Sequence, residues 1–179
     1  MSTSSDAPSA VVSHRVVRQL AVEELVTKNV VGKPLDALQP LIGEWSIEGR
    51  HVAFPTTVIR GRSVFEWWGA RVFLMHRRSY DHPDFPDSVS VIGATRPDGG
   101  LAEHYFDTRG VHRLFDTTFE GGVWTASRNA VGASDFDQRT TATLSPDGNT
   151  ITARSDRTEP GAHEMKFDMS VIYTRMARP

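Results

Sequence analysis

From Gly43 onward the chain is a succession of short segments in which apolar and polar residues alternate. A period of two is typical of β-strands with one buried face. Ten such segments follow one another at intervals of roughly 8 to 14 residues, a spacing that favours an all-β barrel or sandwich. They are Trp45–Phe54, Val58–Trp68, Arg71–Tyr80, Ser88–Arg96, Leu101–Thr108, Val111–Phe119, Val123–Ala130, Phe136–Leu144, Thr150–Arg157 and Glu164–Arg175.

The links between these segments are short and rich in turn-forming residues. Residues 97–100 and 146–149 read Pro-Asp-Gly-Gly and Pro-Asp-Gly-Asn, which predict hairpin turns. No helix-length segment interrupts the series, so parallel βαβ units are excluded. An up-and-down meander of this length leaves long unpaired edges unless it closes. We therefore predict an antiparallel β-barrel of about ten strands over residues 36–179, with room inside for a small ligand.

Residues 1–35 form a predicted N-terminal extension. The first 15 residues or so are small and polar, which predicts disorder. Residues 16–29 have partly helical apolar spacing, which indicates either a helix on the barrel or a disordered, partner-facing segment. A second short helix is expected over residues 34–41, with Asp36 as its N-cap and Pro40 limiting its length.

Composition excludes several classes of protein. A net charge of −2 and a pI near 6.4 give no basic field for nucleic acid or anionic lipid. The chain has no cysteine, which rules out disulfides and thiolate chemistry and fits a reducing cytoplasm. No apolar run approaches the roughly 18 residues of a membrane span, and the N-terminus lacks the pattern of a signal peptide. We expect a cytoplasmic protein.

Alternation assigns faces to the first and last strands. If Trp45 points inward, so do Ile47, Gly49 and His51. In the last segment one face is predicted to hold Met165, Phe167, Met169, Val171, Tyr173 and Arg175, and the other Glu164, Lys166, Asp168 and Ser170.

Gly43-x-Trp45 at the start of the first strand and Arg175 at the end of the last resemble the calycin superfamily of lipocalins and fatty-acid-binding proteins. The resemblance covers roughly residues 38–176. It implies that Trp45 closes the narrow end of the barrel while Arg175 packs across its indole by a cation–π stack. The Trp-x-x-Glu-Gly run and the ten segments look most like bacterial calycin-like families of unassigned function that are related to nitrobindin.

The nitrobindin likeness implies a haem ligand, a histidine in the last strand. Here that region reads Phe-Asp-Met-Ser-Val (residues 167–171), and His163 falls at or before the strand start. The first strand also has Ile47 where the likeness implies one of a run of alternating glycines. Haem binding through that ligand is not expected. A haem or porphyrin protein that uses His76 or His104 instead is an alternative.

Residues 103–113 are the densest polar stretch of the β-region, and two interpretations stay open. One is a solvated turn with weak cross-strand salt bridges. In the other, His104 or Tyr105 points into the cavity with Arg113, where a buried cation needs a neighbour or a bound acid. Fatty-acid-binding relatives use an internal arginine and tyrosine for a ligand carboxylate, so the residue types fit. The predicted lining is His51, Phe65, Trp67, His76, Arg78, Tyr105, Arg113, Trp124 and Arg128.

The leading function is binding of a small, mostly apolar ligand, with an acid group on that ligand as an option. Seven histidines show no metal-site spacing, so no metal is expected. An isomerase or hydrolase that uses Glu66 or Glu103 beside a histidine is less favoured, because no nucleophile elbow or phosphate loop occurs. A solidly packed interaction protein is a further alternative. Trp67 and Trp68 must face opposite sides of a strand, so an exposed indole makes a homodimer plausible.

Overall fold

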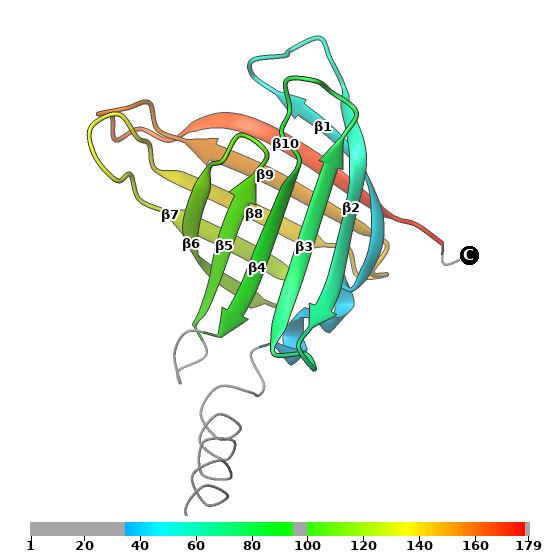
Figure 1. The fold of residues 1–179 in the computed structure, drawn as a ribbon. Helices are drawn as coiled ribbons and strands as arrows, with labels where there is room; N and C mark the ends of the chain where they lie inside the picture. Colours follow the sequence, from blue (N-terminus) through cyan, green and yellow to red (C-terminus); the bar gives the residue numbers. More distant parts are fainter. Residues whose placement is uncertain (1–34, 95–99, 178–179) are drawn as a thin grey trace, which may run out of the picture.

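The computed structural model describes residues 35–94 and 100–177. One 3₁₀-helix, η1 (Asp36–Leu41), precedes ten strands that close into an antiparallel barrel, and β1 pairs with β10 to complete it (Figure 1). The predicted all-β, ten-stranded barrel is confirmed. The strands are β1 (Gly43–His51), β2 (Ile59–Trp68), β3 (Phe73–Tyr80), β4 (Ser88–Ala94), β5 (Leu101–Asp107), β6 (His112–Glu120), β7 (Val123–Arg128), β8 (Gln138–Leu144), β9 (Thr150–Arg157) and β10 (Lys166–Arg175).

The strand ends differ from prediction where turns take over. β1 stops at His51 rather than Phe54, because backbone hydrogen bonds from Phe54 to His51 and from Thr57 to Phe54 turn the chain. β3 begins at Phe73 because Ala70 and Arg71 have positive φ. The predicted turn at 146–149 is present, with Gly148 at φ +72°. Most of the other one, at 97–100, lies outside the described residues, as do residues 1–34.

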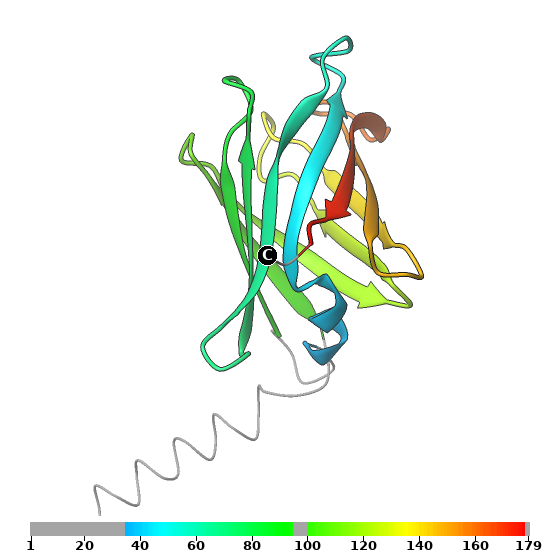
Figure 2. The ribbon, with the colours of Figure 1, turned by 90° about the vertical axis from the view of Figure 1, so that its right-hand side faces the viewer.

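The two ends of the barrel differ. η1 lies across one end (Figure 2) and buries Leu38 and Leu41 against Trp45 in the core. We call this the closed end. The loops at the other end, residues 52–58, 81–87, 108–111, 129–137 and 158–165, surround what we call the mouth. Because strands alternate in direction, β1 runs from the closed end to the mouth and β2 runs back.

η1 differs from the predicted helix at its start. Leu35, not Asp36, is the N-cap residue, and no side chain caps the helix. Asp36 lies inside the first turn and pairs instead with Arg71, at 3.6 Å. Within the described part of the chain, no helix has the length and apolar character needed to span a membrane.

The alternation predicted for β1 is observed, but in β10 it fails at Phe167 and Asp168. Trp45 and Ile47 are buried, as are Val171 and Tyr173. A β-bulge between Phe167 and Met169 inserts Asp168 as an extra residue. Asp168 therefore faces the interior, where it is 9% exposed, while Phe167 faces solvent at 39%. The predicted faces of Phe167 and Asp168 were wrong for this reason.

Candidate functional site

Trp45 and Arg175 seal the closed end. The guanidinium carbon of Arg175 lies 4.0 Å from the centre of the fully buried Trp45 ring. Its nitrogens donate to the carbonyls of Gly148, Ile42 and Pro40 at 2.7, 2.8 and 2.5 Å. The indole nitrogen of Trp45 donates to the Leu41 carbonyl at 3.0 Å, which links η1 to the Trp45–Arg175 pair. Gly43 has φ +134°, and a Cβ there would come within 3.0 Å of Arg175 Nη1.

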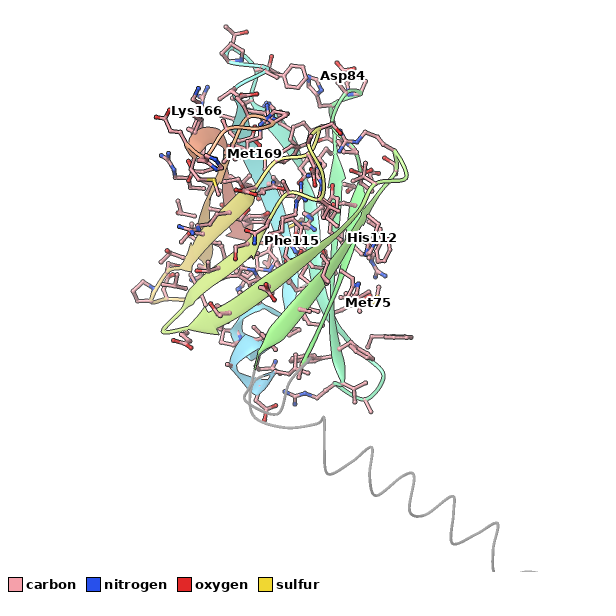
Figure 3. All side chains as sticks on the ribbon, turned by 90° about the vertical axis from the view of Figure 1, so that its left-hand side faces the viewer. Met75, Asp84, His112, Phe115, Lys166 and Met169 are labelled. Atoms are coloured by element: carbon pink, nitrogen blue, oxygen red, sulfur yellow. The ribbon has the colours of Figure 1, made fainter. Side chains whose placement is uncertain are left out.

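A cavity of about 530 Å³ extends from the closed end of the barrel to the mouth. The deeper part of its lining is largely apolar, and Figure 3 shows Phe115 in the barrel and Asp84 in a loop at the mouth. The deep side chains are Leu41, Phe65, Phe115, Trp124, Ala126, Ala142, Ile151 and Ala153. Toward the mouth the lining gains charged and hydrogen-bonding side chains: His51, Arg78, Tyr80, Tyr105, Arg109, Arg113, Gln138, Arg157 and Asp168. Apolar groups from the mouth loops lie among them: Phe54, Phe85, Pro86 and Phe136.

Seven of the nine predicted lining residues surround this cavity, and two do not. Trp67 points toward η1 and donates to Gln39 Oε1 at 3.1 Å. Arg128 is held outside the lining by Asp135, with two hydrogen bonds of 2.8 and 2.7 Å. The seven are His51, Phe65, His76, Arg78, Tyr105, Arg113 and Trp124.

A hydrogen-bonded relay crosses the middle of the cavity wall. Arg78 donates to the hydroxyl of Ser88 at 3.0 Å and to that of Ser90 at 2.6 Å. Ser90 in turn donates to Glu103 Oε1 at 2.6 Å, and Arg78 Nη2 lies 3.7 Å from the same oxygen. Burial opposes the charge on Arg78, but Tyr80 and Glu103 raise its pKa above the ordinary value. The wall therefore holds a cation and an acid that largely offset each other.

Three tyrosines line the same region and stay protonated at neutral pH. Burial raises the pKa of Tyr80, Tyr105 and Tyr173. The Tyr173 hydroxyl interacts with Arg78, whose guanidinium carbon also lies 5.5 Å from the Tyr105 ring centre. Buried phenol groups of this kind can form hydrogen bonds with a ligand in the cavity.

His76 is a neutral, packed residue of the wall. Its Nε2 lies 2.8 Å from the Ser63 hydroxyl, and its ring stacks on Phe65 with the centres 3.7 Å apart. Burial, and then the charge of Arg78, lowers the pKa of His76 well below its usual value. His76 is therefore uncharged at neutral pH.

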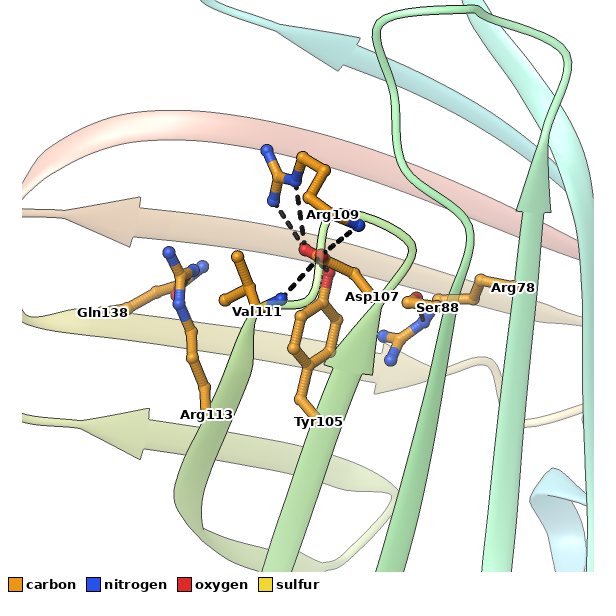
Figure 4. Close-up of polar contacts among 8 residues, drawn as sticks. All are labelled: Arg78, Ser88, Tyr105, Asp107, Arg109, Val111, Arg113 and Gln138. Carbon is orange, nitrogen blue, oxygen red and sulfur yellow. Dashed lines mark hydrogen bonds and ion pairs between the residues drawn. The ribbon is translucent and has the colours of Figure 1, made fainter.

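At the rim, Asp107 organises the β5–β6 hairpin (Figure 4). Tyr105 donates its hydroxyl to Asp107 at 3.1 Å, and Arg109 donates from its side chain at 2.6 Å and its backbone at 3.0 Å. Val111 adds a backbone bond of 3.3 Å. Burial favours the neutral acid, but these hydrogen bonds lower the pKa of Asp107 overall. They fix Tyr105 and Arg109 at the mouth.

Arg113 is the cation of the mouth whose charge is least compensated. Its Nη1 donates to the Gln138 amide oxygen at 3.1 Å, and its guanidinium carbon lies 4.7 Å from the Phe136 ring centre. Among the described residues no carboxylate forms an ion pair with it, whereas Arg128 has Asp135 and Arg157 has Asp168 at 3.0 Å. Burial, and then the nearby charge of Arg128, lowers the pKa of Arg113. Both effects disfavour the bare cation, and a bound anion would offset them.

Sequence reasoning did not place Glu103 or Asp168 in the lining. Glu103 shares the face of Tyr105 by simple alternation, so its inward position was readable. The inward position of Asp168 could not be predicted, because no residue pattern in the sequence indicates the bulge that turns it inward. Inside the barrel it pairs with Arg157 and lies 3.4 Å from His51 Nε2.

The histidines proposed as haem ligands, His76 and His104, do not fit that role, and neither does His51 in the cavity wall. His104 is exposed on the outer face, with its Nδ1 3.4 Å from His112 Nε2, so the alternative that used it for haem is wrong on position. Inside, His76 Nε2 is taken by Ser63, and His51 Nε2 faces Asp168 while its Nδ1 accepts from Ala53 at 3.0 Å. Neither ring presents a free Nε2 to the cavity. In the described residues no cluster of three or more histidine and carboxylate side chains is placed to hold a metal.

The comparisons with known proteins show a similarity of fold alone. No protein-family model matches the chain, and no curated protein matches it. The crystal structure of Rv2717c from M. tuberculosis is similar, with a TM-score of 0.60 and 16% sequence identity, over 82% of this chain and 99% of that chain. A closed ten-stranded barrel with this neighbour fits a calycin-like fold. A closer kinship with the families related to nitrobindin stays a prediction.

Proposed function

We propose that this barrel is a cytoplasmic binding protein for a small amphipathic acid, whose carboxylate pairs with Arg113 and whose apolar chain fills the deep half of the cavity. The observation that carries the proposal is Arg113 itself. It is a partly buried cation in the cavity wall whose hydrogen-bond partner is a neutral amide and not a carboxylate. A bound anion would complete its pairing by charge-assisted hydrogen bonds.

The polarity gradient of the wall supports one orientation of the ligand. Charged and hydrogen-bonding groups gather at the mouth, while Trp124, Ile151 and Leu41 line the deep part. An apolar chain there loses contact with water, at about 25 cal/mol per Å² of buried surface. The acid group then stays near the mouth, close to Arg113 and its partner Gln138. A ligand with the opposite orientation would bury its charge among apolar side chains.

Displacement of a cavity-bound fluorescent dye tests the proposal. Dodecanoic acid is expected to displace the dye, while dodecanol and methyl dodecanoate, which have the same chain without the charge, displace it about tenfold less well. Equal displacement by acid, alcohol and ester would show that Arg113 does not select for an acid. No displacement by any of the three would remove the proposed function.

We also propose that the barrel forms a homodimer through the outer face of β3–β6. The outward side chains there include several apolar groups, and Leu114 and Phe106 are 53% and 42% exposed. Glu66 on the neighbouring strand β2 pairs with Arg77, so this arginine adds no unpaired charge to the contact, whereas Asp116 on β6 is exposed. The outer face of β7–β9 is instead rich in threonine. Outward residues of the first face include Met75, Val89, Val91, Phe106 and Leu114, and of the second Thr125, Thr141, Thr143 and Thr152.

A further inference from the structure

Glu103 lies inside the barrel with only part of its hydrogen-bonding capacity used. Its side chain is 9% exposed, and its Oε1 accepts one hydrogen bond, from Ser90. Over the described part of the chain, no hydrogen bond reaches its second oxygen, Oε2. A carboxylate has acceptor sites for about four hydrogen bonds, and buried polar groups are normally satisfied. Because Glu103 lines the cavity, a group on the ligand is the natural partner of this oxygen.

The surroundings decide what kind of donor suits Glu103. Arg78 already lies 3.7 Å from its Oε1, so the negative charge is largely offset, and a ligand cation would be repelled by the guanidinium. A neutral donor is therefore favoured. Tyr80 lines the same cavity, and its hydroxyl makes no hydrogen bond with any residue that the structure describes. A hydroxyl on the ligand can donate to Glu103 without adding a charge, and the Tyr80 hydroxyl is a further donor in the same cavity, nearer the mouth.

The register fixes the depth of this second polar site. Arg113 pairs with Tyr105 in the β5–β6 ladder, and Phe115 pairs with Glu103. Glu103 is therefore one inward-facing position deeper than the level of Arg113. Two residues of strand correspond to roughly 7 Å. A ligand that reaches both sites carries its acid group and its second polar group separated by several carbon atoms.

We propose that the preferred ligand is a hydroxylated amphipathic acid, with a hydroxyl in the middle of its chain that donates to Glu103 Oε2 while the carboxylate pairs with Arg113. This inference rests on the proposed function and names the chemical class of ligand for the same cavity. An acid without the hydroxyl leaves the buried oxygen of Glu103 unsatisfied in the complex, which reduces its affinity. An acid with the hydroxyl beside the carboxylate, or at the far end of the chain, does not reach Glu103.

Isothermal titration of the full chain with four twelve-carbon acids tests this: dodecanoic acid and its isomers with the hydroxyl beside the carboxylate, in mid-chain, or at the far end. The mid-chain isomer is expected to bind about tenfold more tightly than dodecanoic acid, and the other two no more tightly than it. Glu103→Ala is expected to abolish this preference. The matched control is His104→Ala, on the same strand but with an exposed side chain, which keeps it.

The outcomes separate the two proposals. If all four acids bind with the same affinity, the hydroxyl site is overturned and the binding of acids stands. If the mid-chain preference survives in Glu103→Ala, with the folded state checked by thermal melting, Glu103 is not the partner and the inference is again overturned. If none of the acids binds, the proposed function itself fails.

Discussion

The guanidinium of Arg175, at the end of the last strand, stacks on the indole of Trp45, near the start of the first, 4.0 Å from the ring centre. This contact stabilises the pairing of β1 with β10, which closes the barrel. Arg175→Met is expected to lower the free energy of unfolding by about 2–3 kcal/mol, because it removes the stack and leaves three carbonyls without their charged donor.

Urea denaturation measures this loss, and Arg154→Met provides the comparison. Arg154 also lies over an aromatic ring, that of Phe167, but its side chain is 62% exposed. Its replacement is expected to cost much less than that of Arg175, because water screens an exposed contact. Equal costs for the two variants would mean that the seal at the closed end contributes no more than a surface contact.

Arg113 is expected to control the affinity for acids. Arg113→Met keeps much of the side-chain volume and removes the charge, and it is predicted to weaken dodecanoic acid by about tenfold or more. Dodecanol, which has no charge to pair, should bind almost as before. Arg139→Met, an exposed position beside Gln138, is the control and should change neither affinity. An equal loss for acid and alcohol would point to damaged packing rather than to a lost ion pair.

Burial of His76 makes stability depend on pH. Its pKa in the folded state lies well below that in the unfolded chain, which is about 6.5. Between these two values the unfolded chain binds more protons, so the free energy of unfolding falls as the pH drops below about 6.5. One such group contributes a slope of at most about 1.4 kcal/mol per pH unit.

Urea denaturation at a series of pH values measures this slope in the wild type and in His76→Gln. The variant should lose part of the slope, whereas His104→Gln, at an exposed position, should retain it. An unchanged slope in His76→Gln would assign the acid sensitivity to other groups.

The outer face of β3–β6 is expected to hold two copies together. Leu114→Lys places a charge on that face, at its most exposed apolar residue, and should convert the dimer to a monomer, as measured by size-exclusion chromatography with light scattering. Thr141→Lys puts the same charge on the outer face of β8, where Thr141 is exposed, and should leave the dimer intact. A monomeric wild type at high protein concentration would contradict the proposed assembly.

The ten-stranded architecture could be predicted from the sequence, because the two-residue alternation of strands and the residue types of turns depend on neighbouring residues alone. All ten predicted strands are present, and the inward position of His51 followed from its parity with Trp45. The faces of His76 and Arg113 did not follow from parity, although both side chains line the cavity. Two lining predictions failed to reach the cavity for tertiary reasons. Trp67 lies at the level of η1, which takes up its indole nitrogen, and Arg128 is drawn aside by Asp135 from the following loop.

Pairings across the barrel were beyond sequence reasoning. The relay from Arg78 through Ser90 to Glu103 joins three neighbouring strands, and its exact register depends on how the ladder closes. The inward turn of Asp168 depends on a bulge, which no composition signal marks. Alternation predicts which residues share a face only while the count of residues on the paired strands stays equal.

Because Asp168 is a bulge residue, the charge at the mouth can change through the loss of a single residue. Asp168 is an extra residue between Phe167 and Met169, so a deletion of this one codon would leave both neighbours paired as they are with Asp156 and Ser155. The deletion would remove one negative charge from the rim and release Arg157 from its carboxylate. It would also remove the carbonyl that accepts a hydrogen bond from the backbone of Val52, at 3.0 Å, so the charge of the rim and the position of the loop 52–58 depend on the same residue.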